Sequence, residues 1–324
     1  MKAAVVTEQG LRLQDVPVPK PGPEQVLVKL KAIGLNRADL GVASGHMHGS
    51  VGGPGTIPGM EGAGEVVEVG PGVPDTIRPG MAVMGGIAGA YAEYGLADYG
   101  RLNPVPEGLS WEVAASLPVA LQTMHDAVVT HGQVRPGTTL MIQGASSGVG
   151  LMGMMIGKRM GARLVVGSST NPERRARLAE FGADLAVDTN DPAWVDQVLA
   201  MTDGVGVDTV VDQISGKLMS RTLAATAILG RIVNVGRLGG FKAEFDFDLH
   251  AQRRITYVGV TFRTRTKEEV REIVRKMRAD LWPAVQAGEL RLPIDRILAL
   301  DEVTEALAHM KANRHLGKIV MRVG

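Results

Sequence analysis

The feature that most constrains the fold is a glycine-rich turn in the middle of the 324-residue chain, with Gly144, Gly148 and Gly150 close together. An apolar run, residues 140–142, precedes the turn, and a helix-like run, residues 149–160, follows it. Glycines at this spacing let the backbone turn sharply and come close to a bulky ligand. The first N–H groups of the helix then favour an anion such as a pyrophosphate. The pattern predicts a dinucleotide-binding turn between a strand and a helix.

Two other kinds of protein carry a similar turn, and the chain lacks their further signatures. The turn does not end in Lys followed by Ser or Thr, which a P-loop needs to hold phosphate and magnesium. None of the four tyrosines has Lys four positions later, so the Tyr-x-x-x-Lys pair of short-chain dehydrogenases is missing.

The residues expected to hold the pyrophosphate are Ala145, Ser146, Ser147, Gly148, Val149 and Gly150.

Beyond residue 120, short apolar runs alternate with amphipathic helix patterns. One such helix is expected at residues 172–181, with Pro172 in the favoured first turn. This alternation predicts a doubly wound parallel sheet of the Rossmann type, and six strands complete such a sheet. The strands are expected at residues 139–142, 163–166, 185–187, 209–211, 231–235 and 256–260.

The first 120 residues follow a different pattern, because β-type alternation is broken repeatedly by proline and glycine. Strands are expected at residues 25–31 and 65–69, and the pattern predicts a compact β-rich barrel. Residues 41–59 hold seven glycines and few apolar anchors, which is typical of a functional lid or a disordered loop. After a helix pattern at 267–287, a short strand at 316–323 is expected to rejoin the first domain.

The predicted fold class is therefore α/β, with a Rossmann domain and a β-rich barrel domain, since a chain of this length seldom forms one core. The β-rich domain is expected at residues 1–120 and the dinucleotide-binding domain at residues 121–265. Residues 266–324 form a C-terminal segment that returns to the first domain.

Composition excludes several classes of function. The net charge of +1 indicates no nucleic-acid partner and no anionic membrane surface. No stretch approaches the roughly 20 apolar residues that span a bilayer, and the expected location is cytoplasmic. Cysteine is absent, so disulfides, thiolate metal sites and a cysteine nucleophile are excluded. The seven histidines lack ligand spacing on a helix, and His46 and His48 lie in the Gly-rich loop.

The end of the second strand indicates which dinucleotide is used. An NAD site usually offers a carboxylate there to the ribose 2′-OH, and none is present. Ser168 and Ser169 are followed instead by Arg174, and hydroxyls with a guanidinium suit a 2′-phosphate. Arg177 is interpreted as part of a solvated helix face. The same interpretation is the alternative to phosphate binding for Arg174. These residues favour NADPH.

Several further blocks, in a fixed order, carry a family resemblance. The blocks are residues 36–39 (Asn36, Arg37, Ala38, Asp39), 58–66, 89–94, 114–120, 182–184, 230–233 and 317–320. With these blocks in this order, the chain resembles the medium-chain dehydrogenase/reductase superfamily, specifically its zinc-free NADPH:quinone oxidoreductase (zeta-crystallin-like) branch. The resemblance implies a GroES-like first domain.

The departures from the zinc alcohol dehydrogenases of that superfamily bear on the reaction. Those proteins have a metal-binding Cys near the position of Asn36, and His where this chain has Met60 between Gly59 and Glu61. Both metal ligands are therefore lost, and no metal is expected. Without zinc, the expected reaction is hydride transfer to an acceptor that needs little polarisation by a Lewis acid. Such an acceptor is either a quinone or an activated carbon–carbon double bond.

The resemblance implies roles for individual residues. Asn36 and Asp39 would border the nicotinamide cleft, with Asn36 donating to a quinone oxygen; turn chemistry before a helix is the alternative for Asn36. Thr123 would contact the nicotinamide end, and Arg174 the 2′-phosphate. Thr189 stands where the family often has a tyrosine, which leaves room for NADH. Two more residues, Gly236 and Arg237, would end the fifth strand at the nicotinamide side.

We therefore expect hydride transfer from NADPH to a quinone, with the acceptor between the two domains. The first alternative is reduction of an α,β-unsaturated carbonyl. Related enoyl reductases use a lid tyrosine as proton donor, which residues 1–90 lack, and His46 or His48 could replace it. The second alternative is a cofactor-binding protein with little turnover. A homodimer is expected, because pairing across a two-fold axis would cover the edge strand 256–260.

Overall fold

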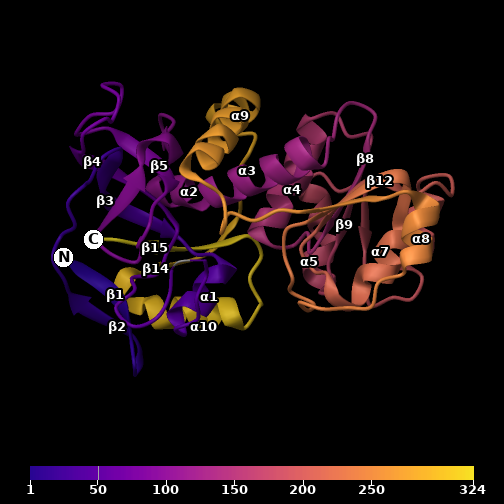
Figure 1. Ribbon diagram of the computed structural model, residues 1–324, viewed down its shortest axis with the longest axis horizontal. Helices are drawn as coiled ribbons and strands as arrows, with labels where there is room; N and C mark the ends of the chain where they lie inside the picture. The colour runs from indigo at the N-terminus through magenta and orange to yellow at the C-terminus, as the bar shows by residue number, and fades with distance from the viewer. Residues whose placement is uncertain (50) are drawn as a thin grey trace. The chain divides into compact units, whose positions relative to one another are not determined.

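A six-stranded parallel sheet forms the centre of one of two units in the computed structural model, which describes residues 1–49 and 51–324 (Figure 1). Unit 1 contains residues 1–119 and 262–324, and unit 2 contains residues 120–261. The unit boundaries lie within a few residues of the domain boundaries expected from the sequence.

The sheet of unit 2 has the strand order β10-β9-β8-β11-β12-β13, and every neighbouring pair is parallel. Its order is that of a complete Rossmann sheet, with the crossover point between β8 and β11. All six predicted strands are present, with bounds that shift by a few residues. They are β8 (Thr139–Gln143), β9 (Leu164–Ser168), β10 (Leu185–Val187), β11 (Val207–Asp212), β12 (Thr226–Asn234) and β13 (Thr256–Gly259).

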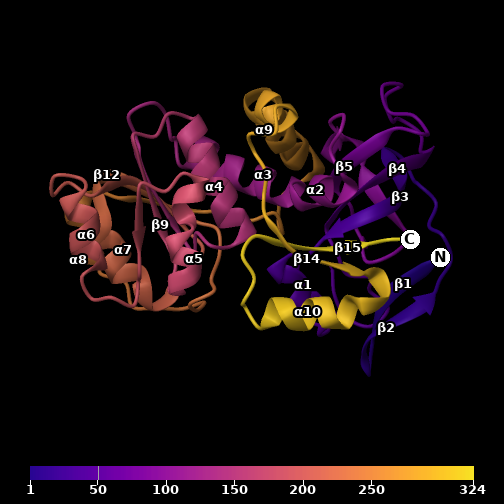
Figure 2. The same ribbon diagram turned by 180° about the vertical axis from the view of Figure 1, so that it is seen from behind.

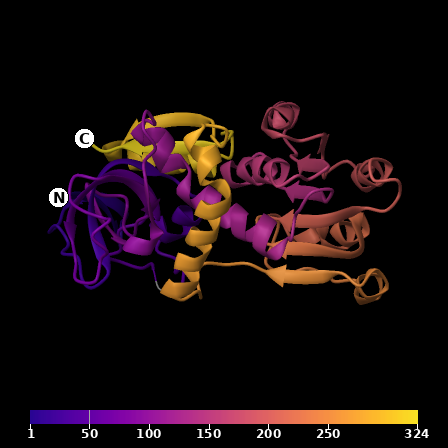
Figure 3. The same ribbon diagram turned by 90° about the horizontal axis from the view of Figure 1, so that it is seen from above.

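Helices cover both faces of this sheet, which is why its central strands are apolar runs rather than alternating ones. On one face, α4 (Gly148–Arg159) packs beside a π-helical segment, His125–His131, that continues α3 (Pro118–Met124). On the other face, α6 (Trp194–Ala200), α7 (Met219–Ala225) and α8 (Phe247–Arg253) follow one another (Figure 3).

The helix expected at residues 172–181 is shorter than predicted. The structure has α5 (Pro172–Ala176), begun by the Asn171 cap, and then a 3₁₀ turn, Leu178–Phe181. Leu178 is the only buried residue of this stretch, so little apolar contact supports a longer helix. The chain leaves the turn at Gly182, whose φ of 94° suits glycine.

Unit 1 is built on a mixed sheet in which the last strand of the chain is internal. The pairing order is β14-β15-β3-β4-β5-β7, and β6 also pairs with β3. Only β14 and β15 pair in parallel among these strands as described, and the other pairs are antiparallel, as expected for the β-rich domain. Its strands are β3 (Gln25–Gly34), β4 (Glu61–Val69), β5 (Ala82–Gly86), β6 (Tyr94–Asp98), β7 (Leu102–Pro104), β14 (Ile294–Ala299) and β15 (Lys318–Arg322).

Four helices and a hairpin complete unit 1. The hairpin pairs β1 (Lys2–Thr7) with β2 (Gly10–Asp15), and α10 (Val303–Lys311) lies against β14 and β15 (Figure 2). The other helices are α1 (Arg37–Ala43), α2 (Trp111–Ser116) and α9 (Lys267–Gln286). No helix among the described residues is long and apolar enough to cross a bilayer.

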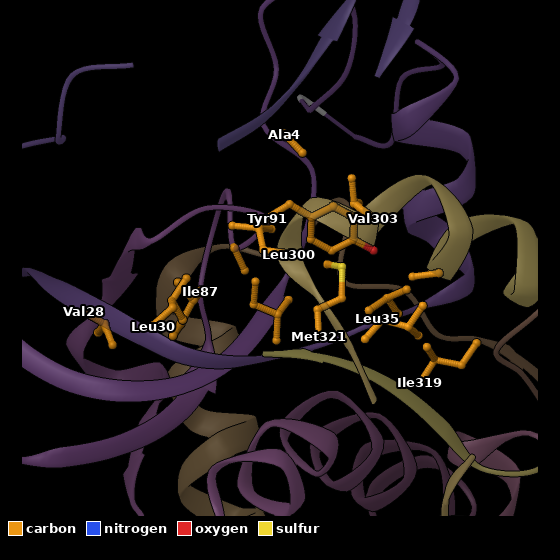
Figure 4. Packing of buried hydrophobic residues seen from close by; sticks show 14 of the residues in the cluster. Ala4, Val28, Leu30, Leu35, Ile87, Tyr91, Leu300, Val303, Ile319 and Met321 are labelled. Carbon is orange, nitrogen blue, oxygen red and sulfur yellow. The ribbon is translucent and has the colours of Figure 1, made fainter. Parts of the chain in front are cut away.

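The core of unit 1 surrounds the buried ring of Tyr91. Figure 4 shows this ring among Leu300, Val303 and Met321, which come from the C-terminal segment of the chain. The C-terminal residues therefore supply part of the hydrophobic core into which the N-terminal strands fold.

Candidate functional site

The glycine turn joins β8 to α4, as predicted. Gly144 has a φ of 72°, a conformation that favours glycine, and Ser147 caps α4 by accepting a hydrogen bond from the Gly150 N–H at 3.0 Å. A Cβ on Gly150 would lie 2.6 Å from the Gly144 carbonyl oxygen and 2.7 Å from Ala145 Cα. Gly150 is therefore required by the close approach of the turn to the first helical residues.

Among the described residues, most N–H groups of the turn already have an acceptor, and three do not. Ala145 N–H donates to the Ser168 carbonyl and Ser147 N–H to the Gly144 carbonyl. Gly148 and Val149 open α4 and have no acceptor within the helix. The N–H of Ser146 likewise has no acceptor among the described residues.

This turn fits the pyrophosphate of a dinucleotide. Of the six residues predicted to hold it, only Ser146, Gly148 and Val149 keep an available backbone N–H, at the positive end of a 12-residue helix. Ala145, Ser147 and Gly150 instead maintain the shape of the turn.

Ser168 and Ser169 lie beside the turn, although they were predicted to bind the 2′-phosphate. The Ser168 hydroxyl, on a residue only 2% exposed, accepts from the Gly144 N–H at 3.1 Å. Ser169 donates its hydroxyl to Ser146 at 3.1 Å. Both hydroxyls are directed at the turn because β9 ends directly beside it, and their contact with a phosphate stays a prediction.

The basic residues that follow β9 differ in their partners. Arg175 contacts the Asp188 carboxylate and the Ser169 carbonyl, both at 2.9 Å, and Arg177 forms a surface pair with Glu180. Arg174 is half-buried, and burial lowers the pKa of its guanidinium below its usual value. Thr189, predicted to lie near the same phosphate, is buried.

The β12 end carries the residues predicted to face the nicotinamide. Gly236 and Arg237 lie two and three residues after the end of β12, and both are half-buried. The Ser215 hydroxyl donates to the Gly236 carbonyl at 2.9 Å, while the Asn234 amide donates to Ser215. This turn is therefore held by side chains from the ends of β11 and β12.

Thr123, also predicted near the nicotinamide, lies on α3 and is half-buried, directly before the π-helical segment. His46 and His48 lie in the predicted lid, where Ser50 is outside the described residues. His46 is exposed, and burial together with the Arg263 charge lowers the pKa of His48 from 6.5.

A buried polar network in unit 1 contains Asn36 and Asp39. The Lys318 ammonium donates to Glu61 Oε1 at 2.6 Å, to Asn36 Oδ1 at 3.0 Å and to the Leu35 carbonyl at 2.7 Å. The Asn36 amide donates to the same Glu61 oxygen at 2.7 Å. Its two polar atoms are thus engaged with Lys318 and Glu61, and a hydrogen bond from Asn36 to a substrate stays a prediction.

Asp39 is also turned inward, because its carboxylate is part of the cap of α1. Its Oδ2 accepts from the Asn36 N–H at 2.8 Å and from the Tyr91 hydroxyl at 2.9 Å. The other oxygen, Oδ1, has no partner among the described residues. Burial raises the pKa of Asp39 to about 7, against the opposing effects of its hydrogen bonds and of Lys318.

The raised pKa of Asp39 predicts a pH-dependent stability. The folded protein holds the proton that the unfolded chain releases near pH 3.8, so this stabilising contribution falls as pH rises through about 7. Asp39→Asn keeps an oxygen for Asn36 and Tyr91 and removes the titration. The difference in unfolding free energy between wild type and this variant should fall by up to about 1.4 kcal/mol per pH unit between pH 5 and 7. Urea unfolding at several pH values measures it, and a constant difference would contradict the prediction.

Among the described residues, no group of three or more His, Asp or Glu side chains could hold a metal ion. Asn36 is occupied by Lys318 and Glu61, and Met60 supplies only a thioether where a ligand would be needed.

Comparisons with known proteins identify the family. A model described as "Alcohol dehydrogenase GroES-like domain" matches residues 22–107, and one described as "Zinc-binding dehydrogenase" matches residues 148–279. The chain belongs to the medium-chain dehydrogenase/reductase superfamily. Within it, the chain belongs to the zinc-free, quinone oxidoreductase-like branch.

Solved structures support this assignment over the whole chain. A mycobacterial protein complexed with NADPH is 26% identical with a TM-score of 0.88, covering 99% of this chain and 100% of that one. A quinone oxidoreductase of Pseudomonas syringae pv. Tomato DC3000 is 26% identical, with a TM-score of 0.85 and coverage of 99% and 100%. An NAD-dependent alcohol dehydrogenase is 29% identical, with a TM-score of 0.86 and coverage of 100% of both chains.

Among curated relatives, a highly reducing polyketide synthase of Purpureocillium lilacinum is 28% identical over 304 residues. The match covers 92% of this chain but only 12% of that protein's length. The chain therefore corresponds to a small part of this relative.

Four residues that bond to predicted site residues were not themselves predicted as site residues. Glu61 and Lys318 occur in the family blocks, but nothing in the sequence pairs them across the chain. Tyr91 and Gln213 likewise contact predicted site residues, Asp39 and Ser147 respectively. A charged residue inside an apolar strand, as Lys318 is in 318–321, was the available signal for a buried partner.

Proposed function

We propose that the chain transfers a hydride from NADPH to a quinone without a metal ion. The observation that carries this proposal is the turn at Gly144–Gly150, with three available N–H groups, in a chain whose metal-ligand positions hold Asn36 and Met60. The similarity to quinone oxidoreductases and to an NADPH complex supports the choice of acceptor and cofactor.

The chain's own residues would act mainly by binding and alignment. Bound NADPH supplies the hydride. The N–H groups of Ser146, Gly148 and Val149 would hold the pyrophosphate, and Arg174 the 2′-phosphate. Thr123, Gly236 and Arg237 are proposed at the nicotinamide end. The network around Asn36 and Asp39 would shape the region of unit 1 that receives the acceptor.

The purified chain, mixed with NADPH and either 1,4-benzoquinone or 9,10-phenanthrenequinone, tests the proposal. Oxidation of NADPH well above the rate without protein is the expected result. Normal NADPH affinity with no turnover of quinones or enones would overturn it and favour a binding role.

A second candidate reaction is reduction of an α,β-unsaturated carbonyl, because a highly reducing polyketide synthase is among the relatives. The same assay with an enone in place of the quinone separates the two reactions. Turnover of the enone alone would make this the function of the chain.

The preference for NADPH over NADH is expected to depend on Arg174. Arg174→Ala should weaken NADPH binding about 10- to 100-fold and leave NADH binding unchanged, because only NADPH carries the 2′-phosphate. Fluorescence titration of both cofactors measures this. Arg177→Ala, at a solvent-exposed ion pair, is the matched control. An equal loss of affinity for NADPH and NADH would show that Arg174 does not bind the 2′-phosphate.

The partner is proposed to be a second copy of the chain. β13 is the outer strand of the unit 2 sheet, and Tyr257 on it is 41% exposed. Pairing of β13 with its copy would satisfy the open strand edge. A monomeric sedimentation mass would contradict this. The cytoplasm remains the proposed location.

A further inference from the structure

The side chain of Gln213 connects the end of β11 to both sides of the glycine turn. Its Nε2 donates to the Gln143 carbonyl at 3.0 Å and to the Gly144 carbonyl at 3.3 Å. Its Oε1 accepts from the Ser147 hydroxyl at 3.1 Å. One buried amide therefore bonds the last residue of β8 and two residues of the turn.

These bonds leave the ligand-facing side of the turn open. Gln213 binds two carbonyls of this region, and among the described residues the neighbouring N–H groups of Ser146, Gly148 and Val149 have no acceptor. Ser147 also caps α4, so the bond from its hydroxyl to Gln213 fixes the start of that helix.

The main chain of the same residue supports a second turn. The Gln213 carbonyl accepts from the Leu238 N–H at 3.2 Å, and a Cβ on Gly236 would lie 2.5 Å from this oxygen. Gln213 thus lies between the turn proposed for the pyrophosphate and the turn proposed for the nicotinamide end.

We infer that Gln213 is a positioning residue for the dinucleotide: its side-chain amide sets the shape of the pyrophosphate turn without contacting the cofactor. The inference rests on the proposed binding of a nicotinamide dinucleotide at this turn, but not on the acceptor that is reduced. Without the amide, the Gln143 and Gly144 carbonyls lose one donor and the Ser147 hydroxyl loses one acceptor, while the bonds between Ser147 and Gly144 remain. Part of the free energy of cofactor binding is then spent in ordering the turn.

Gln213→Met, which keeps the length of the side chain, tests the inference. We expect the variant to bind NADPH and NADH about tenfold more weakly, by the same factor for both. The turnover number at saturating cofactor should change less than about threefold, because the main-chain contact to Leu238 remains. Fluorescence titration measures affinity independently of any acceptor.

Gln143→Met is the matched control. Gln143 is also buried, at the end of the adjacent strand, but its amide donates to Thr222 on α7 rather than to the turn. This variant should lose stability to a similar degree and keep wild-type cofactor affinity. If Gln213→Met does not fold, Gln213→Glu retains the acceptor for Ser147, loses both donors, and should weaken binding of both cofactors equally.

Three results would overturn the inference: equal affinity losses in the Gln213 and Gln143 variants, unchanged affinity in the Gln213 variants, or no dinucleotide binding by the wild-type chain. A wild-type chain that binds NADPH but reduces no quinone would instead refute the proposed reaction and leave the role of Gln213 supported.

Discussion

Gly150→Ala is expected to reduce NADPH affinity by at least about a hundredfold and to abolish activity at ordinary cofactor concentrations. A Cβ at this position would lie 2.6–2.8 Å from backbone atoms of Gly144 and Ala145, which cannot move aside as a flexible side chain does. The turn must open, and the N–H groups of Gly148 and Val149 then no longer converge on one anion. Equilibrium titration of NADPH fluorescence measures the loss.

Gly41→Ala provides the control, because a Cβ there has no neighbour within 4 Å and Gly41 lies in α1. This variant should keep full NADPH affinity and near wild-type stability. NADPH affinity within threefold of wild type in Gly150→Ala would show that the turn does not bind the pyrophosphate.

Lys318→Met is expected to lower the free energy of unfolding by about 3–5 kcal/mol, the usual cost of leaving one member of a buried ion pair without its partner. Glu61 is fully buried, and Lys318 supplies its only cationic contact among the described residues. The Asn36 Oδ1 and the Leu35 carbonyl lose a donor in the same variant. Urea unfolding followed by circular dichroism measures the change.

A double-mutant cycle separates the ion pair from general packing. Combining Lys318→Met with Glu61→Gln removes the uncompensated charge, so the double variant should be more stable than Lys318→Met alone. Arg177→Ala breaks a solvent-exposed pair and should have no measurable effect. Additive losses in the cycle would mean that Lys318 and Glu61 stabilise unit 1 independently.

The sequence predicted those parts of the fold that depend on local pattern. All six strands of unit 2 and the turn at Gly144 follow from apolar runs and glycine spacing within short windows. The break after Ala176 was missed, because a helix pattern does not reveal how little apolar contact supports it.

The side-chain contacts of the site were less predictable, because they join residues far apart in the chain. Lys318 and Glu61 meet across 257 positions, and Gln213 reaches Ser147 across 66. Ser168 was correctly placed at a strand end, but only the neighbouring strand shows that its hydroxyl faces Gly144. Residue types indicated which groups are reactive, and the tertiary structure determines which of them are already bonded.

The internal position of β15 also has a consequence for biosynthesis. Unit 2 is one uninterrupted segment, residues 120–261, and can fold as soon as it has left the ribosome. Unit 1 cannot, because β3 must wait for β15 and Asn36 for Lys318, which are synthesised nearly 300 residues later. During translation residues 32–34 of β3 therefore lack their β15 partner, while unit 2 is already formed. Nascent chains in this state are the ones on which chaperones should act.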